Sequence, residues 1–121
     1  MKNIKFWKMH GAGNDFILVD DRTGDFPLRN RRWIRRICSR HDGIGSEGLI
    51  LLRESAQASF NMRFFNPDGS EADMCGNGVR CAARLAYELG IAGKKMTVET
   101  QAGILNAFVE KDGVRVTMPL A

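Results

Sequence analysis

The segment from Asn66 to Gly78 reads NPDGSEADMCGNG and carries one cysteine from a turn into the predicted start of a helix. The free N–H groups of a first helical turn and the positive end of the helix dipole stabilise an anion. A cysteine at such a position is favoured as a thiolate, which can act as a base. Gly76 and Gly78 have no side chain that would keep a small carboxylate from the same N–H groups. The segment therefore predicts a reactive Cys75 beside a carboxylate cradle.

Cys38 and Cys81 differ from Cys75 in their surroundings. Each lies on the apolar face of a predicted helix, because neighbouring apolar residues follow at helical spacing. We therefore expect both cysteines to be buried and structural. Three cysteines cannot all pair, and the composition is unlike that of a small domain held together by disulfides. At least one thiol is expected to be free, and Cys75 is the candidate for chemistry.

Spacing alone leaves alternatives open for Cys75. It could be buried and inert, or it could pair with His10 or His41 as the nucleophile of a thiol hydrolase. A zinc site is the weakest alternative, because the cysteines lack the gap of about two to four residues typical of structural zinc. The glycine loop 43–48 lacks the lysine and the following Ser or Thr of a phosphate-binding loop. We therefore expect neither a metal nor a nucleotide.

Periodicity locates the elements that must position Cys75. A helix is predicted to begin near Cys75 or Gly76 and to stop at Gly90, because one face is apolar: Val79, Ala82, Ala83, Ala86 and Leu89. Residues 66–69 form a strong turn signal before it. Strands are predicted at residues 3–9, 15–20, 49–52, 59–65, 95–100, 104–110 and 114–118. The first two are separated by a glycine loop, 10–14. Strands dominate and two helices are inserted, so the predicted class is α+β.

The size and composition of the chain fit one domain spanning residues 1–121. It has 121 residues, of which 44% are hydrophobic and 26% charged, which is enough for one modest core. No apolar stretch approaches the roughly 18 residues that a membrane span needs, and the basic N-terminus is not followed by a signal-peptide run. We expect a cytoplasmic protein without a membrane partner. The strand pattern at 114–118 lies so close to the end that the sequence looks cut.

The net charge of +4 arises partly from a basic stretch with no acidic residue. Asn30 can cap a helix whose apolar positions are Trp33, Ile34, Ile37, Cys38 and His41. The arginines then lie on the opposite, solvated face: Arg29, Arg31, Arg32, Arg35, Arg36 and Arg40. Aromatic residues that stack on bases are missing from that face, so no nucleic acid is expected, although a polyanion patch or a protein interface is an alternative.

Four ordered motifs together resemble the first half of diaminopimelate epimerase. They are HGAGNDF at 10–16, RHDGIGSEG at 40–48, FNPDGSE at 65–71 and MCGNGVRC at 74–81, and the resemblance covers residues 5 to about 90. It implies a mixed, mostly antiparallel sheet curled around a helix, as one of two similar domains. It also implies a cofactor-independent isomerase that converts LL-diaminopimelate to the meso isomer, on the route to lysine and peptidoglycan.

The resemblance also assigns roles to individual residues. Cys75 is implied as one of two cysteine bases, and Asn14, Asn66, Gly76 and Asn77 as substrate-binding residues, the two helix-start residues through their backbone. The second cysteine belongs in that family to a second domain, which this sequence lacks. The expected partners are therefore a small amino-acid substrate and the missing carboxy-terminal domain, while a second copy covering the exposed face would give a homodimer. No cofactor is implied.

The sequence departs from that family at two positions of one loop. Gly48 stands where some members carry a substrate-contacting glutamine, and Glu47 stands where aspartate is commoner. The prediction is the amino-terminal domain of a diaminopimelate epimerase, inactive when alone. The alternatives are another cofactor-independent amino-acid racemase of the same fold, or a noncatalytic binding module.

Overall fold

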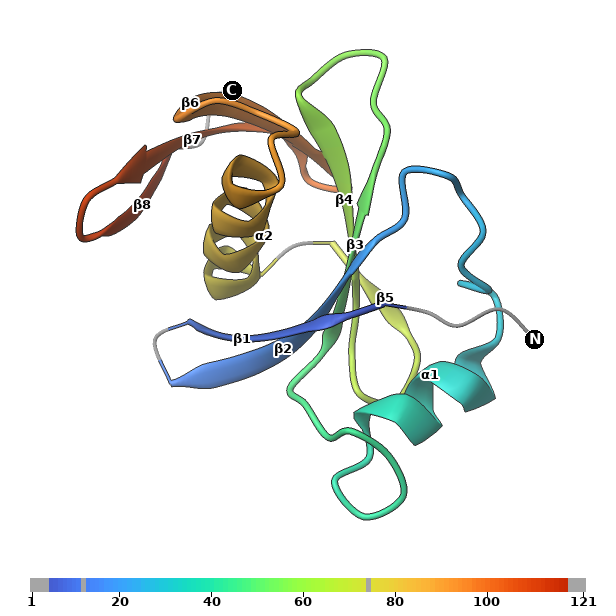
Figure 1. The fold of residues 1–121 in the computed structure, drawn as a ribbon. Coiled ribbons are helices and arrows are strands. Elements are labelled where there is room, and N and C mark those ends of the chain that lie inside the picture. The colour runs from blue at the N-terminus through green and yellow to red at the C-terminus, as the bar shows by residue number, and fades with distance from the viewer. Residues whose placement is uncertain (1–4, 12, 74, 118–121) are drawn as a thin grey trace.

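A computed structural model describes residues 5–11, 13–73 and 75–117. Within these residues, one mixed sheet of eight strands carries a helix on each face (Figure 1). The elements in chain order are β1 (Trp7–Gly11), β2 (Asn14–Asp20), α1 (Arg31–Cys38), β3 (Leu49–Arg53), β4 (Phe60–Phe65), β5 (Glu71–Ala72), α2 (Gly76–Glu88), β6 (Lys95–Thr100), β7 (Gly103–Glu110) and β8 (Gly113–Thr117).

The sheet is mostly antiparallel and curls around α2, as Figure 1 shows. Its strand order is β1-β2-β3-β4-β6-β7-β8, with β5 paired to β4. The β2–β3 and β4–β6 pairs are parallel, and the remaining pairs are antiparallel. The predicted α+β class and the curled mixed sheet are both confirmed.

Two apolar clusters, one on each face, hold the helices to the sheet. In β2 and β3 both faces are buried, so these strands read as continuous apolar runs rather than as alternating patterns. The residues toward α2 include Phe16, Leu18, Ile50 and Leu52. Those toward α1 include Ile17, Val19, Leu49 and Leu51. The chain thus has one continuous sheet as the scaffold for both helices.

Helix α2 approaches the sheet closely because its inner face is built from small residues. A Cβ atom on Gly78 would lie 3.1 Å from Cδ1 of Ile50 and 3.3 Å from the ring of Phe64. The helix ends at its cap residue Leu89, and Gly90 follows with a φ of 75° in the left-handed region that glycine tolerates. The predicted stop at Gly90 is confirmed, and the first turn of α2 rests on β3 and β4.

Helix α1 begins as predicted but is shorter than expected. The side chain of Asn30 accepts a hydrogen bond from the N–H of Trp33 at 3.1 Å, which confirms the cap. The helix ends at Cys38, because the capping N–H of Ser39 turns back to the carbonyl oxygen of Arg36. The interpretation of His41 as part of the apolar helix face was therefore wrong, since His41 is exposed in the following loop.

The strand predictions differ from the structure mainly at their ends. Strand β6 has the predicted bounds, whereas β5 was not predicted because it consists of two residues. The predicted loop 10–14 is tighter than expected, since Gly11 still belongs to β1 and Asn14 already to β2. Residues 3 and 4 of the first predicted strand and Met118 of the last lie outside the described residues. Neither helix among the described residues is long and apolar enough to cross a membrane.

Candidate active site

Cys75 is the residue that caps the N-terminus of α2. Its backbone is extended (φ −132°, ψ 121°), its side chain is half-buried, and its carbonyl oxygen accepts the first helical hydrogen bond, from the N–H of Val79 at 2.9 Å. Among the described residues, its thiol makes no capping hydrogen bond to the helix. Gly76 and Asn77 follow as the first two helical residues, whose N–H groups have no partner within an α-helix. The predicted placement of the thiol at a helix start is confirmed.

The turn between β1 and β2 lies against this helix start. Gly11 pairs with Asn14 at the end of the hairpin. A Cβ atom on Gly11 would be 3.1 Å from the carbonyl oxygen of Asn77 and 3.0 Å from Sγ of Cys81. The hairpin therefore approaches the first turn of α2 so closely that a side chain on residue 11 would force neighbouring atoms to shift. This contact brings Asn14, from the first motif, to the same end of the molecule as the helix start.

Asn66 lies in the turn that leads from β4 toward Cys75. Its N–H donates to the carbonyl oxygen of Ser70 at 2.7 Å, and its side-chain Nδ2 donates to Oγ of Ser70 at 3.2 Å. The same serine hydroxyl donates to Asp68 at 2.5 Å and lowers the pKa of that carboxyl group. Gly69 completes the turn with a φ of 89°. Strand β5 then pairs with the end of β4 and ends three residues before Cys75.

The other two cysteines are buried, as expected. Cys38 is 3% exposed on the inner face of α1, and Cys81 is 4% exposed beneath the hairpin. Burial raises the pKa of both thiols, and the nearby Cys75 sulfur raises that of Cys81 further. A hydrogen bond with Ser46 opposes the shift at Cys38. Both thiols are therefore protonated at neutral pH, and both are less exposed than the half-buried Cys75.

The buried carboxylate of Asp15, the residue after Asn14, pairs with Lys8 in β1 and with Arg40. Oδ1 of Asp15 accepts from Nη2 of Arg40 at 2.8 Å, and Oδ2 accepts from Nη1 of Arg40 at 3.2 Å. Nζ of Lys8 lies 3.1 Å from Oδ2. The hydrogen bonds from Arg40, followed by those from Lys8, hold the pKa of Asp15 well below its usual range despite burial. Arg40 is exposed, as predicted for the arginines of this stretch, but it lies two residues beyond the end of α1 and its guanidinium pairs with Asp15.

Gly48 is buried where the second motif, residues 40–48, joins β3. A Cβ atom there would lie 2.9 Å from Cζ of Phe64 and 3.0 Å from the carbonyl oxygen of Phe65. Phe64 is itself only 6% exposed, so its ring has little room to move. A larger side chain at this position requires a rearranged neighbourhood, which explains why this sequence carries glycine there. Glu47, beside it, is exposed and lies 3.7 Å from Arg40.

The two histidines are both exposed, His10 on β1 and His41 in the loop after α1. In the part of the chain that the structure describes, no group of three His, Cys, Asp or Glu side chains is placed to hold a metal ion.

One contact at the helix start was missed by the sequence analysis. Nη1 of Arg80 donates to Oδ1 of Asn77 at 3.3 Å, and Nε donates to the carbonyl oxygen of Val114 in β8 at 3.3 Å. The spacing of three residues between Asn77 and Arg80 on a helix was the available signal. The carbonyl partner could not be found in this way, because Val114 is 34 residues away.

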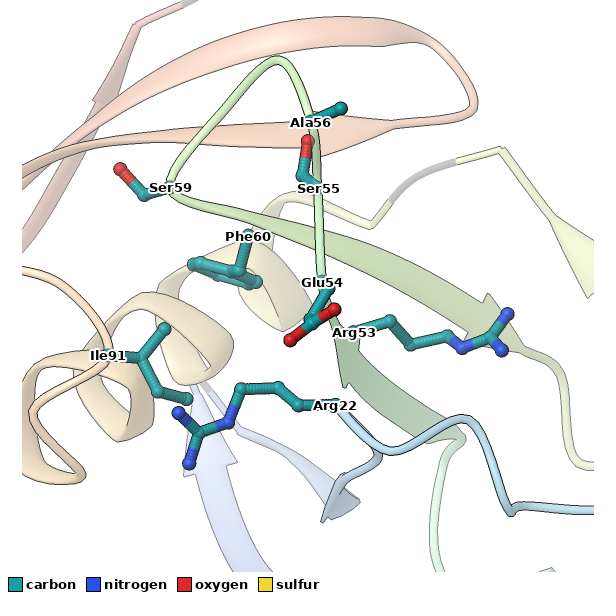
Figure 2. A pocket seen from close by; sticks show the side chains of 8 residues that line it. All are labelled: Arg22, Arg53, Glu54, Ser55, Ala56, Ser59, Phe60 and Ile91. Carbon is teal, nitrogen blue, oxygen red and sulfur yellow. The ribbon is translucent and has the colours of Figure 1, made fainter.

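A pocket of about 440 Å³ lies at the opposite end of α2 (Figure 2). Its lining includes Arg22, Ile91 and the buried side chain of Phe60. Arg22 makes two hydrogen bonds with the carboxylate of Asp20, at 2.9 and 2.8 Å. The charge of Arg22 is thus already compensated. This pocket lies beyond the C-terminal end of α2, about 20 Å from its N-terminal end at 1.5 Å per residue.

Comparison with solved structures defines the fold. The crystal structure of the Bacillus anthracis phenazine biosynthesis protein of the PhzF family matches with a TM-score of 0.71 at 26% identity, over 96% of this chain and 40% of that one. The curled sheet around one helix is therefore the fold shared by diaminopimelate epimerase-like and PhzF proteins.

Comparison with known sequences identifies the family within that fold. The chain belongs to the diaminopimelate epimerase family, whose model matches residues 6–120. It is 53% identical to diaminopimelate epimerase from Moorella thermoacetica, over 93% of this chain and 41% of that protein. It is 44% identical to the Aquifex aeolicus enzyme, over 97% of this chain and 45% of that protein. The chain thus spans less than half the length of these curated relatives.

Proposed function

We propose that residues 1–121 form the amino-terminal half of an epimerase that converts LL-diaminopimelate to meso-diaminopimelate, a precursor of lysine and peptidoglycan. The family membership supports the reaction class, and the position of Cys75 at the start of α2 is the single observation that carries the mechanism. The reaction inverts one α-carbon without a cofactor. One sulfur removes the α-proton from one face, and a second group returns a proton to the opposite face.

In this proposal, Cys75 is one of the two bases. As a thiolate it takes the α-proton and becomes a thiol, and in the reverse direction its thiol donates a proton to the carbanion. Cys75 directly precedes the first turn of α2, whose free N–H groups and helix dipole stabilise negative charge. Cys38 and Cys81 do not fill the second role, because both are buried and their pKa values are raised. The second base is supplied by another domain.

The helix start also stabilises the charge that develops during the reaction. Loss of the α-proton places negative charge on the α-carbon and its carboxylate. Gly76 and Asn77 present their N–H groups where that carboxylate would bind. Since the charge is greater in the transition state than in the bound substrate, this stabilisation lowers the barrier. The missing side chain of Gly76 leaves the N–H groups accessible.

Asn14 and Asn66 complete the half-site on this chain. An asparagine side chain offers both a donor and an acceptor, which suits the ammonium and carboxylate groups of an amino acid. The hairpin contact at Gly11 holds Asn14 near α2, and the turn from Asn66 to Ser70 leads toward Cys75. Substrate binding would replace the hydrogen bond between Asn66 and Ser70.

A chimeric protein tests the proposal. Residues 1–121 joined to the remaining part of the Moorella thermoacetica relative should convert LL-diaminopimelate to the meso isomer. Cys75→Ser should abolish that conversion, whereas the matched variant Cys81→Ser should keep most of it in a folded protein. Equal activity of the Cys75→Ser variant and its parent would remove Cys75 from the mechanism. Circular dichroism of each variant establishes that it is folded.

A further inference from the structure

Arg80 links the first turn of α2 to the edge strand β8. Its Nε donates to the carbonyl oxygen of Val114, and its Nη1 donates to the side-chain Oδ1 of Asn77, both at 3.3 Å. The same Nη1 lies 3.8 Å from the position that a Cβ atom of Gly76 would occupy. The guanidinium group of Arg80 therefore contacts both the sheet and Asn77, and it lies close to Gly76 at the start of the helix.

The contact with Asn77 fixes the orientation of an amide group. A guanidinium has only hydrogen-bond donors, so it can bind the oxygen of an asparagine but not its NH₂ group. Because the oxygen and nitrogen lie on opposite branches of the amide, the Nδ2 donor of Asn77 is turned away from Arg80. Asn77 is held with one defined face of its side chain available to a ligand.

We propose that Arg80 is a positioning residue of the carboxylate cradle. It orients the side chain of Asn77, and its positive charge beside Gly76 makes the surroundings of Cys75 selective for anions. This inference rests on the proposed function insofar as Gly76 and Asn77 bind the carboxylate of the substrate. Its physical consequence, a preference of the Cys75 region for an anionic reagent, can be measured on the chain without any epimerisation.

Arg84 provides a matched control on the same helix. It lies one turn further along α2, and its Nη2 donates to the carbonyl oxygens of Glu110 and Gly113 at 3.2 Å. Arg84 thus performs the same structural task as Arg80, since it joins α2 to the β7–β8 hairpin. Among the residues that the structure describes, its hydrogen bonds go to the hairpin and not to the helix start. Removal of either arginine changes the net charge equally.

The test compares two alkylating reagents that differ only in charge. Iodoacetate carries a carboxylate and iodoacetamide is neutral, and mass spectrometry gives the labelling rate of Cys75 with each reagent. In Arg80→Gln the ratio of the iodoacetate rate to the iodoacetamide rate should fall about threefold to fivefold, as expected in water for loss of one charge roughly 5 Å from the carboxylate of the reagent. Arg84→Gln should leave the ratio unchanged, and Arg80→Lys, which keeps the charge, should give an intermediate value.

Two results would overturn this inference. An equal fall in Arg80→Gln and Arg84→Gln would mean that only net charge or the helix–hairpin contact matters. An unchanged ratio in both Arg80→Gln and Arg80→Lys would remove Arg80 from the cradle. Failure of the chimera to epimerise diaminopimelate would contradict the proposed function but would leave this ratio as it is. The two proposals can therefore fail separately.

Discussion

Gly11 and Cys81 are in such close contact that a Cβ atom on Gly11 would lie 3.0 Å from the Cys81 sulfur. Gly11 belongs to the hairpin that carries Asn14, and Cys81 lies one turn and a half into the helix that begins after Cys75. The distance between these two parts of the proposed half-site is thus set by the absence of one side chain. This relationship leads to the first prediction.

Gly11→Ala should destabilise the chain by about 1–3 kcal/mol, because the added methyl group forces the hairpin away from α2. Urea unfolding followed by circular dichroism measures the change. Gly93→Ala is the matched control, since a Cβ atom there has no heavy atom within 4 Å among the described residues. Its effect should stay within about 0.5 kcal/mol. Equal stability of the two variants would contradict the close contact.

The three thiols should differ in reactivity under native conditions. Cys75 should be alkylated by iodoacetamide faster than Cys38 and Cys81, because burial raises the pKa of both other thiols and hinders access to them. Peptide mass spectrometry over a time course gives the three rates. Cys75→Ser should lose the fast phase and keep the fold, since serine can cap a helix. Equal labelling of all three thiols in the folded chain would count against the assignment.

The Asp15 carboxylate should contribute to stability in a way that depends on pH. Its pKa is lowered in the folded chain, so its contribution is present above the ordinary carboxyl pKa of 3.8 and is lost as the pH falls below that value. The difference in unfolding free energy between the parent chain and Asp15→Asn should therefore shrink from pH 6 toward about pH 2. The other carboxylates are present in both proteins, so their contributions to the unfolding free energy cancel in the difference. A difference that does not vary with pH would refute the role of this ion pair.

The basic surface of α1 should bind nucleic acid only weakly. The exposed arginines Arg29, Arg31, Arg32, Arg35 and Arg36 lie on and just before a short helix. Binding through phosphates alone is insensitive to sequence and falls steeply with salt. Fluorescence anisotropy with labelled DNA and RNA should show weak binding that disappears at moderate salt. Tight, sequence-selective binding at physiological salt would contradict both this interpretation and the epimerase proposal.

Much of the secondary structure could be predicted from the sequence, because caps, helix ends and strands are marked by residues that lie close together in the chain. The Asn30 cap, the stop at Gly90 and the bounds of β6 follow from residue type and period within a few positions. The placement of Cys75 at the start of α2 follows in the same way from the glycines around it. Strand β5 carries too few residues to show a period, and its existence depends on pairing with β4.

The parts that could not be predicted depend on contacts between distant segments. Arg40 has the same local pattern as its arginine neighbours, and only the fold brings it to Asp15, 25 residues away. The contact of Gly11 with α2 and the contact of Arg80 with β8 are of the same kind. The roles of Asn14, Asn66, Gly76 and Asn77 came from the family resemblance, because an asparagine in a turn has many structural uses.

The most direct test of the two-base proposal uses the 121-residue chain alone. The pure chain is incubated with LL-diaminopimelate in deuterated water, and both α-deuterium incorporation and formation of the meso isomer are measured. With only one base and an open half-site, where water weakens the stabilisation by the helix, turnover should be far below that of a complete epimerase. Activity should appear when the complementary domain of a relative is added. Full turnover by the chain alone would contradict the proposal, because both bases would then have to lie within these residues.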